Sequence, residues 1–239
     1  MMSQAVLFFG NAGAGKSELL NQVGGNFVPG IKFRAGYTKD IDEQWCNIGG
    51  QRYLLMDAPG LYEPDENETV SNALKLTEAL SKGYTYKLFF VLAAGPRGPG
   101  NAEMLMMARV NECVQKARSK ASFWVIINQI QTVEMRQMYY DHMVADKCQS
   151  LLESVRSQIG DEHGLQNAFD IKIDGVELIM MFNKASARNE KIRAILHNCI
   201  RNHIAASVKV SQPIRATNND LTLFEKILRF IISFFSWIE

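Results

Sequence analysis

The chain has 239 residues, of which 47% are apolar and 21% are charged, and its 26 basic and 25 acidic side chains leave a net charge of +1. This length suffices for one sizeable α/β domain with an appendage, or for two small domains. The balanced charge argues against a general nucleic-acid binder, and the four scattered cysteines favour separate reduced thiols over a disulfide framework.

Short β-rich runs alternate with stretches of helical periodicity along the chain. This alternation predicts an α/β fold with a mostly parallel sheet covered by helices on both faces. Gly49-Gly50 is a two-residue hairpin signal, so the strands that flank it are expected to pair antiparallel. The expected strands are Ala5–Phe9, Trp45–Ile48, Gln51–Met56, Lys87–Ala93, Phe123–Asn128 and Val176–Phe182. The expected helices are Lys16–Val23, Asn67–Leu80, Asn101–Lys116, Glu134–Gln158 and Ala187–Ser207.

The first expected strand leads into a glycine-rich loop that fits the pattern GxxxxGK[ST] and precedes a helix. Glycines let backbone N–H groups point at phosphate oxygens, and the helix N-terminus adds partial positive charge. Lys16 is expected to reach the terminal phosphates of a nucleoside triphosphate, and Ser17 to ligate Mg²⁺. The residues expected to line the nucleotide are Gly10, Asn11, Ala12, Gly13, Ala14, Gly15, Lys16, Ser17 and Glu18.

A second motif, Asp57-Ala58-Pro59-Gly60, follows the third expected strand. An acid at the carboxyl end of a buried strand is placed to hold Mg²⁺ through water, while the Gly60 N–H faces a γ-phosphate. Loss of that phosphate would then release the loop. The alternative is an ordinary turn, because this sequence favours turns by itself.

Together these motifs resemble the GTPase branch of the phosphate-loop proteins, and in detail the AIG1-type, or GIMAP-like, G domains. The GxxGxGKS loop of that family matches Gly10–Ser17, and its DTPGL segment corresponds to DAPGL at residues 57–61. Its switch threonine fits Thr38-Lys39, and its late FNNKA segment is close to Phe182–Ala185, one asparagine short.

The resemblance implies a three-layer P-loop G domain that binds GTP or GDP with Mg²⁺. Thr38 is implied to sense the γ-phosphate and to complete the metal shell with Ser17 and Asp57, so that Lys16, Thr38 and Gly60 form the catalytic set. The alternative for Thr38 is a solvated loop residue. GIMAP-like proteins associate with membranes and form nucleotide-dependent oligomers, which implies homo-oligomer formation through the G domain and peripheral membrane contact as options.

Two positions depart from the pattern of GTPases. The guanine-reading N/TKxD motif is replaced by Asn128-Gln-Ile-Gln131, and a neutral amide cannot accept both N–H donors of guanine as a carboxylate does. Asn128 and Asn183 are the expected base contacts, with helix capping or turn roles as the alternative. Leu61 replaces the water-orienting glutamine, so hydrolysis is expected to be slow. Arg97 is a candidate substitute, although a structural role in its turn is favoured.

The organisation along the chain is expected to be a G domain (1–210), a polar connector (211–220) and an apolar helix (221–239) with one narrow polar stripe. That helix is expected to dock on the G domain, pair with another subunit or lie in a membrane interface. The apolar run at 5–9 is too short for a signal segment, so the cytoplasm is the expected location. His197 and His203 are interpreted as surface or core residues, and Met104–Met107 as core packing.

The main hypothesis is a GTP-binding switch that hydrolyses GTP slowly and controls association through its nucleotide state. The second is a module that holds nucleotide without hydrolysis, motivated by Leu61 and the altered base motif. An ATP-using kinase is the third, disfavoured because Arg188, Arg193 and Arg201 are too regularly helical for a lid.

Overall fold

The computed structural model describes residues 3–28, 40–62, 66–95, 101–116, 121–159, 166–180, 189–208, 210 and 213–214. Its strands are β1 (Gln4–Phe9), β2 (Asp42–Ile48), β3 (Gln51–Asp57), β4 (Thr85–Ala93), β5 (Phe123–Ile130), β6 (Ile173–Met180) and β7 (Ala206–Ser207). Its α-helices are α1 (Lys16–Val23), α2 (Glu66–Ser81), α3 (Asn101–Lys116), α4 (Val133–Tyr139), α5 (Gln149–Ile159) and α6 (Glu190–Asn202). A π-helical turn η1 (Tyr140–Val144) and a 3-10 turn η2 (Gln166–Phe169) complete the described elements.

The strands form one sheet in the order β2-β3-β1-β4-β5-β6, with β7 added to β4. The pairs from β3 to β6 along this order are parallel, whereas β2 and β3 are antiparallel. Gly49 and Gly50 connect that hairpin at φ 59° and 83°, the left-handed backbone that a two-residue turn needs. The predicted α/β class, the mostly parallel sheet and the antiparallel hairpin are confirmed.

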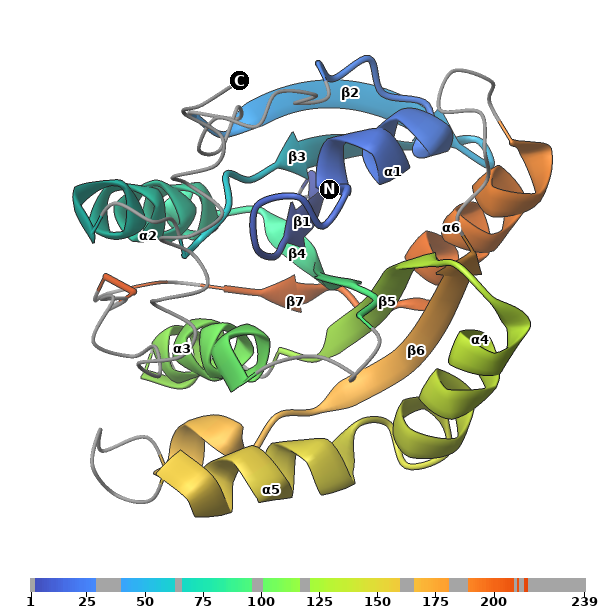
Figure 1. The fold of residues 1–239 in the computed structure, drawn as a ribbon. Coiled ribbons are helices and arrows are strands. Elements are labelled where there is room, and N and C mark those ends of the chain that lie inside the picture. Colours follow the sequence, from blue (N-terminus) through green and yellow to red (C-terminus); the bar gives the residue numbers. More distant parts are fainter. Residues whose placement is uncertain are drawn as a thin grey trace, which may run out of the picture.

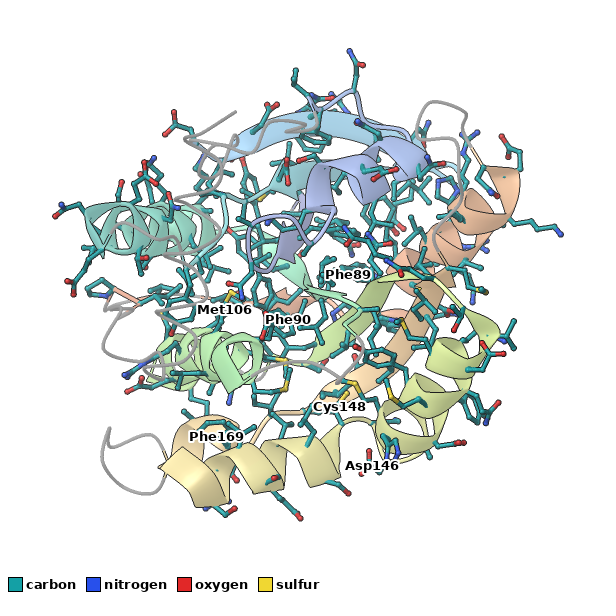
Figure 2. All side chains as sticks on the ribbon, viewed as in Figure 1. Phe89, Phe90, Met106, Asp146, Cys148 and Phe169 are labelled. Carbon is teal, nitrogen blue, oxygen red and sulfur yellow. The ribbon has the colours of Figure 1, made fainter. Side chains whose placement is uncertain are left out.

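Helices cover both faces of the sheet, which makes three layers (Figure 1). One core cluster lies between the sheet and α2, α3 and α5, and the other lies between the sheet and α1 and α6. Neighbouring strand residues serve opposite faces: Phe90 belongs to the first cluster and Phe89 to the second (Figure 2). All four residues of Met104–Met107 are buried in the first cluster, which confirms the prediction of core packing.

Two predicted helices have different ends in the structure. The run predicted at Glu134–Gln158 divides into α4, η1 and α5, because the Asp146 carboxylate accepts a hydrogen bond from Ser150 N and starts a new helix. Lys147 and Cys148 lie at φ 53° and 64° in this break. The helix predicted over Ala187–Ser207 ends at Asn202, because the chain turns and pairs as β7 with the start of β4.

His203, the residue after α6, is fully buried at the amino-terminal edge of the sheet. Its Nδ1 donates to Asp174 Oδ2 at 2.9 Å, and the Ser122 hydroxyl donates to the same oxygen at 2.6 Å. Burial lowers the pKa of His203, which keeps the imidazole neutral. Burial by itself raises the pKa of Asp174, but the hydrogen bonds from Ser122 and His203 bring it below its ordinary value. His203 is therefore a core residue, as predicted.

Acid is expected to destabilise the fold through His203. Because its folded pKa is lowered, the unfolded chain binds a proton as the pH falls below about 6.5 while the folded chain does not. The free energy of unfolding should then fall by up to about 1.4 kcal/mol per pH unit below pH 6.5. Urea unfolding between pH 7.5 and 5 measures this slope, and His203→Gln should reduce it; an equal slope in the variant would contradict the assignment.

The chain beyond β7 returns to the core. Val208 and Ile214 are buried in the cluster under α2 and α3, and Ile214 N donates to Thr77 Oγ1 at 2.8 Å. Apart from Pro213 and Ile214, the predicted connector 211–220 and helix 221–239 lie outside the described residues, so those boundaries stay predictions. No helix within the described ranges has the length and hydrophobicity needed to cross a bilayer.

Candidate nucleotide-binding site

The predicted motifs meet at the carboxyl-terminal edge of the parallel strands. Phe8 of β1 pairs with Asp57 of β3, and Ala93 of β4 pairs with Asn128 of β5. The glycine-rich loop after β1 therefore lies between the end of β3 and the end of β5. This edge is where open α/β sheets bind their ligands, and the sheet brings Gly10–Ser17, Asp57 and Asn128 together.

The loop is built so that only glycine fits at two of its positions. A Cβ on Gly10 would lie 2.2 Å from the Val91 carbonyl oxygen. Gly15, the N-cap of α1, has φ 84°, and a Cβ there would lie 2.4 Å from Asn128 Nδ2. At Gly13, in contrast, the space around an added Cβ is open. The loop thus presses against β4 and β5 and leaves open space at Gly13.

We expect Gly10→Ala to lower the free energy of unfolding by about 3 kcal/mol or more, because its methyl group would collide with the β4 backbone. Gly13→Ala is the matched control. Its methyl group meets no atom within 4 Å, so the substitution is opposed only by the left-handed backbone at φ 77°. We expect this backbone strain to lower the free energy of unfolding by about 1–2 kcal/mol. Urea unfolding of both variants tests the difference, and equal costs would show that the loop does not pack as described.

Lys16 and Ser17 begin α1 at the mouth of the loop. Lys16 is 6% exposed, and its ammonium donates to the carbonyl oxygens of Gly10 at 3.1 Å and Asn11 at 2.9 Å. The Ser17 hydroxyl donates to Asp57 Oδ2 at 2.5 Å. Glu18 is exposed on the first helical turn.

These residues fit a magnesium-bound nucleotide. The glycine-rich loop leads directly into the N-terminus of α1, and the first backbone N–H groups of an α-helix are suited to donate to a phosphate. Ser17 and Asp57 bring a hydroxyl and a carboxylate together from α1 and β3, and Mg²⁺ prefers such oxygen ligands. Lys16 holds a positive charge against the wall of the same loop. The arrangement is suited to binding a polyphosphate together with a hard cation.

Side chains from neighbouring elements hold the loop in place. Asn11 Nδ2 donates to Glu103 Oε1 on α3 at 3.0 Å, and Asn128 Nδ2 donates to the Ala14 carbonyl at 3.0 Å. Gln129, at φ 65°, donates from Nε2 to the Gly13 carbonyl at 2.7 Å. The sequence pointed to Asn128, although its predicted role as a base contact stays a prediction. It gave no signal for Glu103, which is 92 residues from Asn11 in the chain.

The Asp57–Gly60 turn is anchored in the core. Ala58 N donates to the Phe8 carbonyl at 3.3 Å, and Leu61 and Tyr62 are buried in the cluster against α2 and α3. The Leu61 side chain, 2% exposed, therefore packs into the core. Asn72 of α2 donates from Nδ2 to the Gly60 carbonyl at 2.7 Å, a contact that sequence reasoning missed.

Several predicted site residues lie outside the described residues. They are Thr38, Asn183, Arg97 and the segment 182–185, whose roles stay predictions. The loop that contains Arg97 begins at Gly95, where the Tyr139 hydroxyl accepts from Gly95 N at 2.9 Å and lies 3.1 Å from Gly95 O. Burial raises the pKa of Tyr139, so the phenol stays protonated and able to donate.

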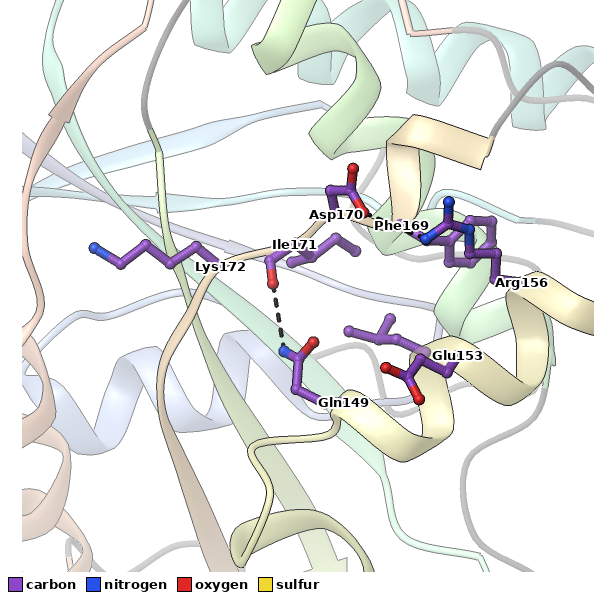
Figure 3. A pocket seen from close by; sticks show the side chains of 8 residues that line it. Gln149, Glu153, Arg156, Phe169, Asp170, Ile171 and Lys172 are labelled. Carbon is purple, nitrogen blue, oxygen red and sulfur yellow. Dashed lines mark hydrogen bonds and ion pairs between the residues drawn. The ribbon is translucent and has the colours of Figure 1, made fainter.

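A hollow of about 270 Å³ lies between α5 and the residues that precede β6 (Figure 3). It is at the amino end of β6, away from the glycine-rich loop. Arg156 pairs with Asp170 at 3.4 Å, and Gln149 donates to the Ile171 carbonyl at 3.4 Å. None of the residues that line this hollow belongs to the glycine-rich loop or to the Asp57–Gly60 turn, so it is separate from the nucleotide site.

The geometry agrees with a family assignment from the sequence. Residues 5–129, just over half of the chain, match the family described as 50S ribosome-binding GTPase. The chain belongs to this GTPase family. The match runs from β1 to Gln129, one residue before the end of β5, so it contains the glycine-rich loop, the Asp57–Gly60 turn and Asn128.

Individual relatives of this GTPase resemble only part of it. It is 28% identical to GTPase Era of Fusobacterium nucleatum over 120 residues, which are 49% of this chain and 39% of Era. It is 23% identical to GTPase Der of Pelotomaculum thermopropionicum over 141 residues, 59% of this chain and 30% of Der. The chain thus spans well under half the length of these relatives.

Solved structures share the fold at low sequence identity. Toc33 from Arabidopsis thaliana, in complex with GDP and Mg²⁺, has a TM-score of 0.51 and 15% identity, covering 87% of this chain and 89% of that one. A structure of chloroplast translocon components has a TM-score of 0.54 and 15% identity, covering 90% of this chain and 87% of that one. Its report states that dimerization is important for the GTPase activity of those components. These likenesses confirm the P-loop GTPase fold.

Proposed function

We propose that this GTPase binds Mg·GTP through the loop Gly10–Ser17, hydrolyses it slowly and changes its associations with the nucleotide state. The observation that carries the proposal is the contact between the Ser17 hydroxyl and Asp57 Oδ2, at 2.5 Å, next to the loop that holds the buried Lys16. A metal ligand pair next to a cationic phosphate loop is the arrangement that P-loop GTPases use. The Toc33 structure with GDP and Mg²⁺ supports the choice of ligand and metal.

Each residue then has a distinct role. Lys16 neutralises charge on the β- and γ-phosphates, and Ser17 ligates Mg²⁺. Asp57 holds a water of the metal shell, and Thr38 completes that shell when the triphosphate is bound. The Gly60 N–H donates to the γ-phosphate.

Slow hydrolysis follows from the position of Leu61. Its side chain is apolar and packed in the core, so it cannot orient a water molecule toward the γ-phosphate. A group supplied by a second copy of the chain would raise the rate, as an arginine does in other GTPases. The statement that dimerization is important for the GTPase activity of the chloroplast translocon components supports such a contact here.

The AIG1-like subfamily is part of the proposal, supported by DAPGL at 57–61 and by Thr38-Lys39. Within it, we propose homo-oligomer formation through the G domain and peripheral contact of residues 221–239 with a membrane from the cytoplasm. The net charge of +1 gives no support to a nucleic-acid partner.

Titration of GTP, GDP and ATP with Mg²⁺ by calorimetry tests the proposal. Tight binding of GTP and GDP, with ATP at least about tenfold weaker, is expected if Asn128 and its neighbours read the base; preferential ATP binding would favour the ATP-using enzyme. Phosphate release measured at increasing protein concentration separates a slow GTPase from a silent binding module. A rate per molecule that rises with concentration supports oligomer-assisted hydrolysis, whereas no release at any concentration leaves the silent module.

A further inference from the structure

Asn72 lies on α2 and reaches back to the Asp57–Gly60 turn that precedes this helix. Its Nδ2 donates to the Gly60 carbonyl at 2.7 Å, and the residue is only 8% exposed. A buried amide has to find partners inside the protein, and this one spans twelve residues of sequence to do so. This hydrogen bond does not stabilise α2 internally, because its acceptor, the Gly60 carbonyl, lies outside the helix.

The turn is otherwise fixed on either side of Gly60 rather than at it. Ala58 N is held by the Phe8 carbonyl, and Leu61 and Tyr62 are anchored by burial in the core. Gly60 has no side chain that packing can hold. The Asn72 amide therefore restrains the turn at the residue whose N–H faces the γ-phosphate in the proposed function.

We propose that Asn72 is a positioning residue that holds Gly60 ready for the γ-phosphate and so sets the preference of the site for a nucleoside triphosphate over the diphosphate. The inference rests on the proposed role of Gly60. With its carbonyl fixed, the Gly60 backbone samples fewer orientations before ligand arrives, so less order has to be imposed on binding. A diphosphate does not reach Gly60 and gains nothing from this restraint.

The test compares the binding of GDP and of the non-hydrolysable analogue GMPPNP, both with Mg²⁺, to the full chain by calorimetry. In Asn72→Ala, the affinity for GMPPNP should fall about 3- to 10-fold, the factor expected for one lost hydrogen bond, while the affinity for GDP stays within about twofold. Asn72→Leu is the second variant. It removes the donor but keeps the volume of the side chain, which protects the fold if the smaller residue does not.

Asn111 supplies a matched control on α3. It is 3% exposed, and its Nδ2 donates to the Ala168 carbonyl at 2.9 Å, far from the phosphate loop. Asn111→Ala also removes one buried hydrogen bond, so it should lower the unfolding temperature about as much as Asn72→Ala does. It should leave the ratio of GMPPNP affinity to GDP affinity unchanged.

The outcomes separate this inference from the proposed function. If the Asn72 variants weaken both nucleotides equally, or behave like Asn111→Ala, Asn72 has only a structural role and the inference is wrong while nucleotide binding stands. If the wild-type chain binds neither nucleotide more tightly than a Lys16→Ala chain does, the proposed function itself fails.

Discussion

Replacing Lys16 by alanine is expected to weaken the binding of both GTP and GDP by at least about 100-fold. In the structure the ammonium is buried against the loop carbonyls of Gly10 and Asn11, where a bound nucleotide would bring its β- and γ-phosphates. Two charge-assisted hydrogen bonds are then lost, each worth about 1.5–3 kcal/mol. Calorimetric titration with Mg²⁺ present measures the loss directly.

Lys82→Ala is the control for this prediction. Lys82 is a partly exposed lysine that pairs with Glu43 at 2.6 Å, so its removal takes away the same charge from a surface site. It should leave both nucleotide affinities within about twofold, since surface ion pairs contribute little. An unchanged GDP affinity in Lys16→Ala would mean that the loop does not hold the β-phosphate.

Gln131→Asp is expected to strengthen GTP binding by about 10- to 150-fold. The residue is exposed just after β5, at the position where GTPases carry the aspartate that accepts the two N–H donors of guanine. A carboxylate offers two acceptors where the glutamine amide offers one, and a charge-assisted hydrogen bond is worth about 1.5–3 kcal/mol. The same titrations, with GTP and ATP in parallel, measure the gain.

Two comparisons make the Gln131 prediction specific. Gln131→Asn has the length of aspartate without its charge and should give little or no gain. Inosine triphosphate lacks the 2-amino group of guanine, so its affinity for Gln131→Asp should rise less than that of GTP. An equal rise for ATP would show that the new carboxylate does not read the base.

The sequence predicts those parts of the site that are local in the chain. The loop Gly10–Ser17 stands between a strand and a helix, and Asp57 directly ends a strand, so parallel pairing alone brings the two motifs to one edge of the sheet. The hairpin at Gly49-Gly50 is equally local, because its turn chemistry lies in two residues.

What the sequence does not show are contacts that depend on tertiary packing. Glu103 reaches Asn11 from α3, and Asn72 reaches Gly60 from α2, without any periodicity that marks them. The division of the predicted helix at Asp146 was missed for a related reason, since a capping carboxylate inside a helical pattern looks like an ordinary polar residue. β7 is only two residues long. It forms because β4 begins three residues before its pairing with β5 starts at Leu88, which leaves Thr85 and Tyr86 to pair with β7.

The return of the chain through β7 to Ile214 sets the minimal length of a stable domain. The family match ends at residue 129, yet Thr85 and Tyr86 of β4 are paired by Ser207 and Ala206, and Ile214 sits in the core beneath α2. A protein that ends before Ala206 would leave the backbone of Thr85 and Tyr86 unpaired and expose the apolar residues that Val208 and Ile214 cover. Unpaired strand edges and exposed apolar patches both favour self-association. Truncations designed to isolate the nucleotide-binding unit should therefore retain the chain through Ile214.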